Sequence, residues 1–134
     1  MKNELKIYFD ESITLEPSNI SMLNGHIGLY FIFNPRVSIS YPFKPSNLIY
    51  IGMSEKKTNS IGKRLLGHHV GSSKNMGIIN YQKEQVLKFT YLNFEILESN
   101  WKNTVEELEN YFINDFIANY GVYPICNNKS SKKL

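Results

Sequence analysis

The stretches GLYFIF (residues 28–33) and LIYIG (residues 48–52) decide the expected fold of this chain. Both are rich in aromatic and β-branched residues, which favours extended strands. Side chains along a strand alternate between its two faces, so Tyr30 and Tyr50 each share a face with a glycine. If the strands pair antiparallel with Tyr30 opposite Tyr50, both phenols emerge on one face of the sheet. The glycines leave room for a ligand to approach the backbone there, so this face is a candidate site.

A short helix is predicted next, from Ser60 as its N-cap to about His69. Residues four apart lie on one side of a helix, so Arg64 and His68 point the same way. Arginine is scarce in the sequence, since Arg36 and Arg64 are the two arginines among 15 Lys and Arg residues. The planar guanidinium of Arg64 can hold a phosphate through two parallel hydrogen bonds, which suggests an anion site on this helix.

The clearest helix signal lies between Thr104 and Gly121. Thr104 and Glu107 form a capping box, and Gly121 stands where a helix ends. The apolar residues of this segment fall on one stripe, formed by Val105, Leu108, Phe112 and Phe116. Glu109 falls inside the same arc. A carboxylate that faces a core must be paired, protonated or bound to a cation, so Glu109 is a candidate functional residue.

The ordered positions Tyr30, Tyr50, Arg64 with His68, Glu109 and Asn127 resemble the pattern of the GIY-YIG nuclease family. The resemblance spans residues 28 to 128, nearly the whole chain. The two triplets of the pattern are Gly28-Leu29-Tyr30 and Tyr50-Ile51-Gly52. Either triplet alone is a weak signal, whereas the ordered set of positions is specific. One departure is the loop from Asn34 to Asn47, which is longer than the tight connection usual in the family. Some DNA-cutting members also carry an enlarged loop there.

The resemblance implies an α/β fold in which helices flank a small mixed or antiparallel sheet. The expected strands are Gly28–Phe33, Leu48–Ile51 and Val86–Leu97, with the helices that carry Arg64 and Glu109 beside them. Residues 1–134 then form a single domain, with an N-terminal extension over residues 1–25 and a basic tail over residues 129–134.

The activity implied by the resemblance is metal-dependent hydrolysis of DNA phosphodiester bonds by an enzyme of restriction, phage or mobile-element type. Glu109 would hold Mg²⁺, with Mn²⁺ as a substitute, and Arg64 would clamp the scissile phosphate. Three residues compete as the general base, namely Tyr30, Tyr50 and His68. A phenol with a pKa near 10 needs a nearby cation to act at neutral pH, whereas an ordinary imidazole does not. The alternative function is a non-catalytic nucleic-acid-binding module on the same fold.

Further contacts to DNA are expected from basic and polar side chains outside the catalytic set, namely Lys63, Asn127, Arg36 and Lys44. The last two lie in the loop from Asn34 to Asn47, which also carries Tyr41. Aromatic and cationic residues in such a loop suit stacking on nucleic acid. Equally, Tyr41 can pin the long loop to the body of the protein, and the sequence does not separate these interpretations.

Composition sets broader limits. The chain has 134 residues, 42% hydrophobic residues and a net charge of +3, and its pI near 8.9 permits nucleic-acid binding without requiring it. Cys126 is the single cysteine, so no intrachain disulfide forms and a reducing compartment is expected. No apolar run reaches membrane-spanning length, and no signal peptide is apparent. We therefore expect a cytoplasmic protein without a membrane partner.

The N-terminal residues lie outside the resemblance. Two short strands are predicted there, Leu5–Phe9 and Ser12–Leu15. They form either added structure at the edge of the sheet or an arm that contacts DNA or a second copy. Exposed strand edges invite pairing, and twofold dimers are the commonest oligomers, so a homodimer is predicted.

Overall fold

A four-stranded antiparallel sheet in the order β1-β6-β2-β5 forms the centre of the computed structural model, which describes residues 13–97 and 104–127. A separate two-stranded sheet pairs β3 with β4. The elements are β1 (Ile13–Thr14), α1 (Pro17–Ile20), the 3₁₀ helix η1 (Ser21–Leu23), β2 (Gly28–Phe33), β3 (Ile39–Ser40), β4 (Pro45–Ser46), β5 (Leu48–Ser54), α2 (Ile61–Val70), α3 (Met76–Gln82), β6 (Lys88–Asn93), α4 (Phe94–Leu97) and α5 (Val105–Tyr120). The predicted α/β fold with an antiparallel sheet flanked by helices is confirmed.

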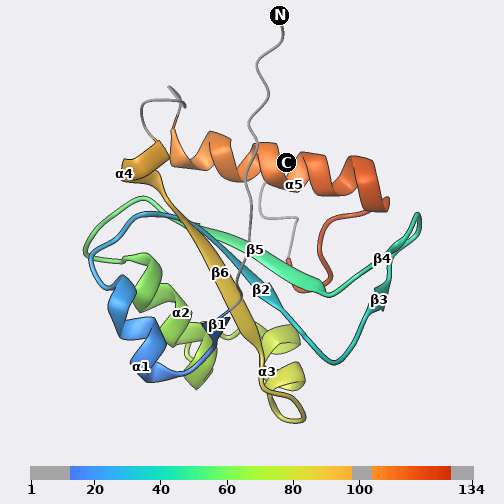
Figure 1. The fold of residues 1–134 in the computed structure, drawn as a ribbon, viewed down its shortest axis with the longest axis horizontal. Coiled ribbons are helices and arrows are strands. Elements are labelled where there is room, and N and C mark those ends of the chain that lie inside the picture. Colours follow the sequence, from blue (N-terminus) through green and yellow to red (C-terminus); the bar gives the residue numbers. More distant parts are fainter. Residues whose placement is uncertain (1–12, 98–103, 128–134) are drawn as a thin grey trace, which may run out of the picture.

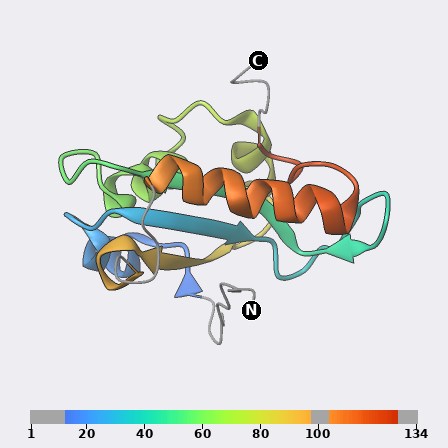
Figure 2. The same ribbon diagram turned by 90° about the horizontal axis from the view of Figure 1, so that it is seen from above.

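Helices cover both faces of the sheet, as Figure 1 shows, with α5 on one side and α1, α2 and α3 on the other. In Figure 2, α5 lies along the strands. Each face has its own hydrophobic core. One contains Ile20, Ile61, Leu65 and Ile78 from the helices with Tyr30 and Phe89 from the sheet. The other contains Val105, Leu108 and Phe116 of α5 with Leu29, Phe31 and Ile51.

The register between β2 and β5 differs from the expected one. Tyr30 lies opposite Gly52, and Ile32 lies opposite Tyr50, so the direct pairing of the two tyrosines that was considered above does not occur. The two phenols nevertheless share a face of the sheet, because a shift of two residues preserves the alternation of side chains. Their ring centroids are 6.0 Å apart.

Strict alternation along β5 fails at its first residues. The register shifts after Ile32, so Phe33 pairs with Leu48 and Ile49 becomes an extra residue. Such a bulge reverses the side-chain faces on one side of it. As a result Ile49 packs in the same core as Tyr30, and Leu48 packs in the core beneath α5.

The strand expected over Val86–Leu97 is shorter in the structure. It begins at Lys88 and ends at Asn93, and Phe94–Leu97 form the short helix α4. The side-chain oxygen of Asn93 accepts a hydrogen bond from the backbone N–H of Glu95 at 2.9 Å, which starts this turn. Val86, the first residue of the expected strand, is exposed. The strand lies inside the sheet, because β6 pairs with β1 on one side and with β2 on the other.

At the N-terminal side, Ile13–Thr14 pair with β6 and add an edge to the sheet, which confirms the described part of the strand predicted at Ser12–Leu15. The strand predicted at Leu5–Phe9 and the basic tail lie outside the described residues. The helical turns of α1 and η1, between Pro17 and Leu23, were not predicted. Among the residues that the structure describes, no helix is both long and apolar enough to cross a membrane.

The predicted helix ends are confirmed. Ser60 caps α2 by accepting a hydrogen bond from the backbone N–H of Lys63, and Gly71 ends this helix in the left-handed region with φ of 89°. Thr104 and Glu107 form the capping box of α5, and Gly121 ends it with φ of 97°. These ends fix the length of the helix that carries Arg64 and of the helix that carries Glu109.

The long loop between β2 and β5 is anchored by Tyr41. This side chain is buried, its hydroxyl donates to the carbonyl of Leu48 at 2.7 Å, and it accepts from the N–H of Ile125 at 3.0 Å. Its ring also packs edge-on against Phe116, with centroids 5.0 Å apart. Of the two interpretations of Tyr41, the structure favours pinning. Phe43, by contrast, is 69% exposed.

Candidate active site

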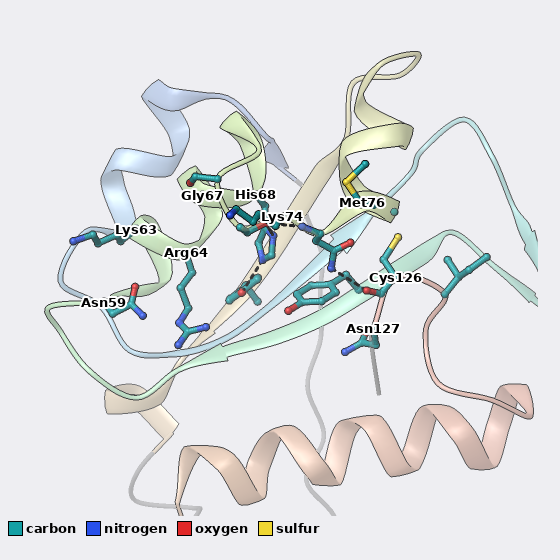
Figure 3. A pocket seen from close by; sticks show the side chains of 16 residues that line it. Asn59, Lys63, Arg64, Gly67, His68, Lys74, Met76, Cys126 and Asn127 are labelled. Carbon is teal, nitrogen blue, oxygen red and sulfur yellow. Dashed lines mark hydrogen bonds between the residues drawn. The ribbon is translucent and has the colours of Figure 1, made fainter. Parts of the chain in front are cut away.

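A cavity of about 780 Å³ opens where β2 and β5 meet α2, the loop between α2 and α3, and the last described residues of the chain (Figure 3). It is lined by Tyr30 and Tyr50 from the sheet and by Lys63, Arg64 and His68 from α2. The opposite lining comes from the segments 72–77 and 125–127. Sequence segments far apart along the chain therefore build one site.

Close packing of α2 fixes its position beside the sheet. The backbone N–H of Ile61 donates to the carbonyl of His26 at 2.9 Å, which ties the start of the helix to the segment before β2. Gly62 lies directly against Asn24, since an added Cβ at position 62 would stand 2.7 Å from the Asn24 backbone nitrogen. Ile61 and Leu65 are fully buried. The helix is therefore held by tertiary packing, as its two glycines require.

The central pair of the site is Tyr30 and His68. Tyr30 is fully buried and its hydroxyl lies 3.0 Å from Nε2 of His68. The other ring nitrogen of His68, Nδ1, lies 2.9 Å from the hydroxyl of Ser73. The histidine tautomer sets which group donates in each of these hydrogen bonds. The imidazole is thus held from both sides in one orientation.

Three rings pack together at the base of the cavity. The centroid of Tyr50 lies 4.9 Å from that of His68 and 6.0 Å from that of Tyr30. Tyr50 is half-buried, whereas Tyr30 and His68 are buried. Tyr50 is therefore the most accessible of the three candidate bases.

Burial dominates the proton affinities of these groups. It raises the pKa of the Tyr30 phenol well above its ordinary value, with a further increase from Tyr50 and a decrease from Arg64. Burial also raises the pKa of Tyr50, against which a hydrogen bond with Tyr30 and the charge of Arg64 act. Burial, with the charge of Arg64, lowers the pKa of His68 to about 4. At neutral pH all three rings are uncharged.

The cavity is positively charged. Lys63, Arg64 and Lys74 line it, and none of the described lining residues is Asp or Glu. Arg64 extends from α2 toward the strands in Figure 3, while Lys63 points outward. Ser73 and Lys74 were missed by the sequence analysis, because the loop that carries them matches no motif. A lysine among short polar residues gives no signal until the fold brings it to the cavity.

Glu109 lies outside the set of lining residues. It is half-buried on α5, rather than fully buried as its place in the apolar arc suggested. Its charge raises the pKa of both Tyr30 and Tyr50, so it lies close enough to act on them. Over residues 13–97 and 104–127, no group of three or more His, Cys, Asp or Glu side chains could hold a metal ion.

The expected DNA contacts divide into two groups. Lys63 and Asn127 line the cavity, whereas Arg36 and Lys44 belong to the loop near β3 and β4, at the opposite end of the sheet from α2 (Figure 1). Lys44 Nζ lies 5.1 Å from the ring centroid of Tyr120. Arg36 and Lys44 are therefore not brought together with Arg64.

Asn127 uses its side chain to bind the backbone of β5. Its Oδ1 accepts from the N–H of Ile51 at 2.9 Å, and its Nδ2 donates to the carbonyl of Ile51 at 2.9 Å. The N–H of Cys126 also donates to the carbonyl of Ile49 at 2.8 Å. These hydrogen bonds hold residues 125–127 as one wall of the cavity.

No family model matches this chain, and no curated protein or solved structure matches it either. The residues that line the cavity therefore carry the functional argument on their own. They comprise two phenols, a neutral imidazole and three cationic side chains.

Proposed function

We propose that this chain is a divalent-metal-dependent endonuclease that hydrolyses DNA phosphodiester bonds, of restriction, phage or mobile-element type, on a GIY-YIG nuclease-like fold. One observation carries the proposal. Tyr30, Tyr50, Arg64 and His68 line a single cavity that is cationic and has no carboxylate among its described lining residues. Such a lining suits a polyanion better than a neutral or cationic ligand.

The resemblance to GIY-YIG nucleases gains support from the positions that meet. Of the five positions that carry it, Tyr30, Tyr50, Arg64 with His68, and Asn127 line the cavity, while Glu109 acts on it from α5. The lining residues among them come from four separate parts of the chain. A chance set of matches gives no reason for that convergence.

Arg64 would bind the scissile phosphate. It is exposed at the cavity, and its planar fork fits two phosphate oxygens at once. Neutral His68 adds no charge there and holds Tyr30 in place through its 3.0 Å hydrogen bond. Arg64 would thus place a fixed positive charge beside the phosphate oxygens, on which negative charge develops as the phosphate is attacked.

Tyr50 is our choice for the general base. Tyr30 is fully buried with its hydroxyl engaged by His68, and both ring nitrogens of His68 have partners. Tyr50 reaches the cavity and is half-buried. The hydrogen bond with Tyr30 and the charge of Arg64 both favour its phenolate form, although burial keeps its pKa above the ordinary value.

Glu109 would hold the divalent cation. A single carboxylate suits Mg²⁺, which keeps several water ligands and is often bound by one or two carboxylates together with substrate phosphate. Because no group of three or more His, Cys, Asp or Glu side chains could hold a metal ion over residues 13–97 and 104–127, the cation would depend on Glu109 together with water and the substrate phosphate. When bound, the ion supplies stabilisation of the negative charge on the leaving oxygen and the phosphate.

Cleavage of supercoiled plasmid DNA tests the proposal directly. The purified chain is expected to convert the plasmid to nicked or linear form with Mg²⁺ or Mn²⁺ and to lose this activity in EDTA. Tyr50→Phe, which removes the hydroxyl and keeps the ring, separates intrinsic activity from a contaminating nuclease. Binding without cleavage under every divalent cation would contradict the enzyme and favour the non-catalytic DNA-binding module.

A further inference from the structure

The loop between α2 and α3 is fixed on both sides of Lys74. On one side, the hydroxyl of Ser73 lies 2.9 Å from Nδ1 of His68. On the other, Nδ2 of Asn75 donates to the carbonyl of Cys126 at 2.9 Å, and its Oδ1 accepts from the N–H of Ile78 at 3.1 Å. Side-chain hydrogen bonds to three different elements therefore set the path of this loop along the cavity.

Lys74 itself has an unusual backbone conformation. Its φ is 64°, and among the described residues it is the one non-glycine residue with positive φ. Its N–H donates to the carbonyl of Gly71 at 3.1 Å, so the turn is closed through this residue. A glycine would adopt this conformation without strain, whereas a lysine adopts it at a cost. An outlier of this kind at a cavity motivates a functional explanation for the side chain.

The charge of Lys74 is available for a ligand. The residue is exposed and lines the cavity, and within the described parts of the chain it forms no ion pair. Figure 3 labels Lys74 beside His68, with Met76 farther from Lys63 and Arg64. The cavity therefore receives positive charge from two elements, α2 and the fixed loop.

We propose that Lys74 binds a second phosphate of the DNA strand whose scissile phosphate Arg64 holds. This inference rests on the proposed function in requiring a nucleic-acid ligand, but it does not require catalysis. A strand that crosses the cavity meets Arg64 on α2 and Lys74 on the loop. The two contacts fix the direction of the strand across the three rings, which one cationic group cannot do.

Equilibrium binding in EDTA tests the inference without cleavage. A fluorescent DNA duplex is titrated with wild type and with Lys74→Gly at several salt concentrations. The slope of log K against log salt concentration is about −0.9 per phosphate contact, so Lys74→Gly should reduce the magnitude of this negative slope by about 0.9. Because glycine removes the backbone strain, the same variant should unfold at an equal or higher urea concentration.

Two further variants sharpen the result. Lys74→Arg retains the charge and should keep the wild-type slope. Lys83→Ala removes an exposed lysine just beyond α3 that does not line the cavity, and should also leave the slope unchanged. An unchanged slope in Lys74→Gly, or an equal loss in Lys83→Ala, overturns the inference while leaving the proposed function intact. Absence of wild-type binding overturns both.

Discussion

Tyr30 and Gly52 lie directly opposite each other in neighbouring strands, and the ring of Tyr30 crosses the space that a side chain at position 52 would fill. A Cβ at that position would stand 2.6 Å from the Tyr30 hydroxyl oxygen. The glycine of the YIG triplet thus has a structural reason in this chain. It lets a buried phenol lie flat across β5 and reach His68.

Gly52→Ala should therefore displace Tyr30 and break its hydrogen bond with His68. We expect a loss of about 1–3 kcal/mol in the free energy of unfolding, typical of overpacking, together with reduced cleavage. Urea unfolding and plasmid cleavage measure the two effects. Gly67→Ala is the stability control, because its Cβ would meet nothing closer than 3.5 Å. Alanine is more favourable than glycine in a helix interior by about 1 kcal/mol, so this variant should be at least as stable as wild type. Equal stability of Gly52→Ala and wild type would contradict the packing argument.

His68 should make the stability depend on pH. An imidazole has a pKa near 6.5 when exposed, and this one is lowered to about 4 by burial and by Arg64. The unfolded chain therefore binds the proton more tightly between these values. This difference contributes about 3 kcal/mol to the free energy of unfolding. The contribution is complete above pH 6.5 and is lost as the pH falls toward 4. Urea unfolding at pH 7 and pH 5 should show a smaller difference for His68→Gln than for wild type, and an equal difference would refute the shift.

If Tyr50 is the general base, the cleavage rate should rise with pH beyond neutrality. The pKa of Tyr50 is raised by burial, so the phenolate fraction increases about tenfold per pH unit below that pKa. Initial rates at pH 7, 8 and 9 with saturating Mg²⁺ measure this slope. Tyr50→Phe should lose both the activity and the slope. A rate that is flat across this range would exclude a phenol as the base.

Arg64→Lys should be nearly as damaging as Arg64→Ala, with cleavage rates within about tenfold of each other, because lysine keeps the charge but loses the planar fork. Rates at saturating DNA, compared with the dissociation constant in EDTA, separate orientation of the phosphate from simple attraction. Wild-type activity in Arg64→Lys would show that this residue contributes general electrostatics alone.

Glu109→Gln should reduce cleavage by a factor on the order of 100 or more and leave DNA binding in EDTA largely unchanged. The amide keeps the shape of the side chain but lacks the charge that a divalent cation needs. Glu106→Gln, an exposed position on the same helix, is the matched control and should cleave normally. If Glu109→Gln cuts at the wild-type rate with Mg²⁺, the carboxylate has another role.

The common face of Tyr30 and Tyr50 could be predicted from sequence, because alternation along a strand is local. The register could not, since it depends on Tyr30 crossing Gly52 and on the extra residue at Ile49. A run of apolar residues in the sequence does not show whether one ring packs across the next strand, and it does not show where a bulge lies.

The two walls of the cavity also differ in how far their residues could be predicted from the sequence. Arg64 and His68 were predictable because a helix places residues four apart on one side. Ser73 and Lys74 were not, because their positions depend on hydrogen bonds to His68 and Cys126, which are distant in sequence or belong to another element. Asn127 was expected to contact DNA, and its amide also binds the Ile51 backbone.

The two hydrogen bonds between the Asn127 side chain and the Ile51 backbone also affect the order in which the protein folds. The contact joins residues 76 positions apart, so the polypeptide must close a large loop before Asn127 can reach Ile51. β2 and β5 are close in sequence, so their pairing closes a much shorter loop. We therefore expect the sheet to form first and residues 125–127 to dock afterwards, so that the chain acquires its cavity at the last step of folding.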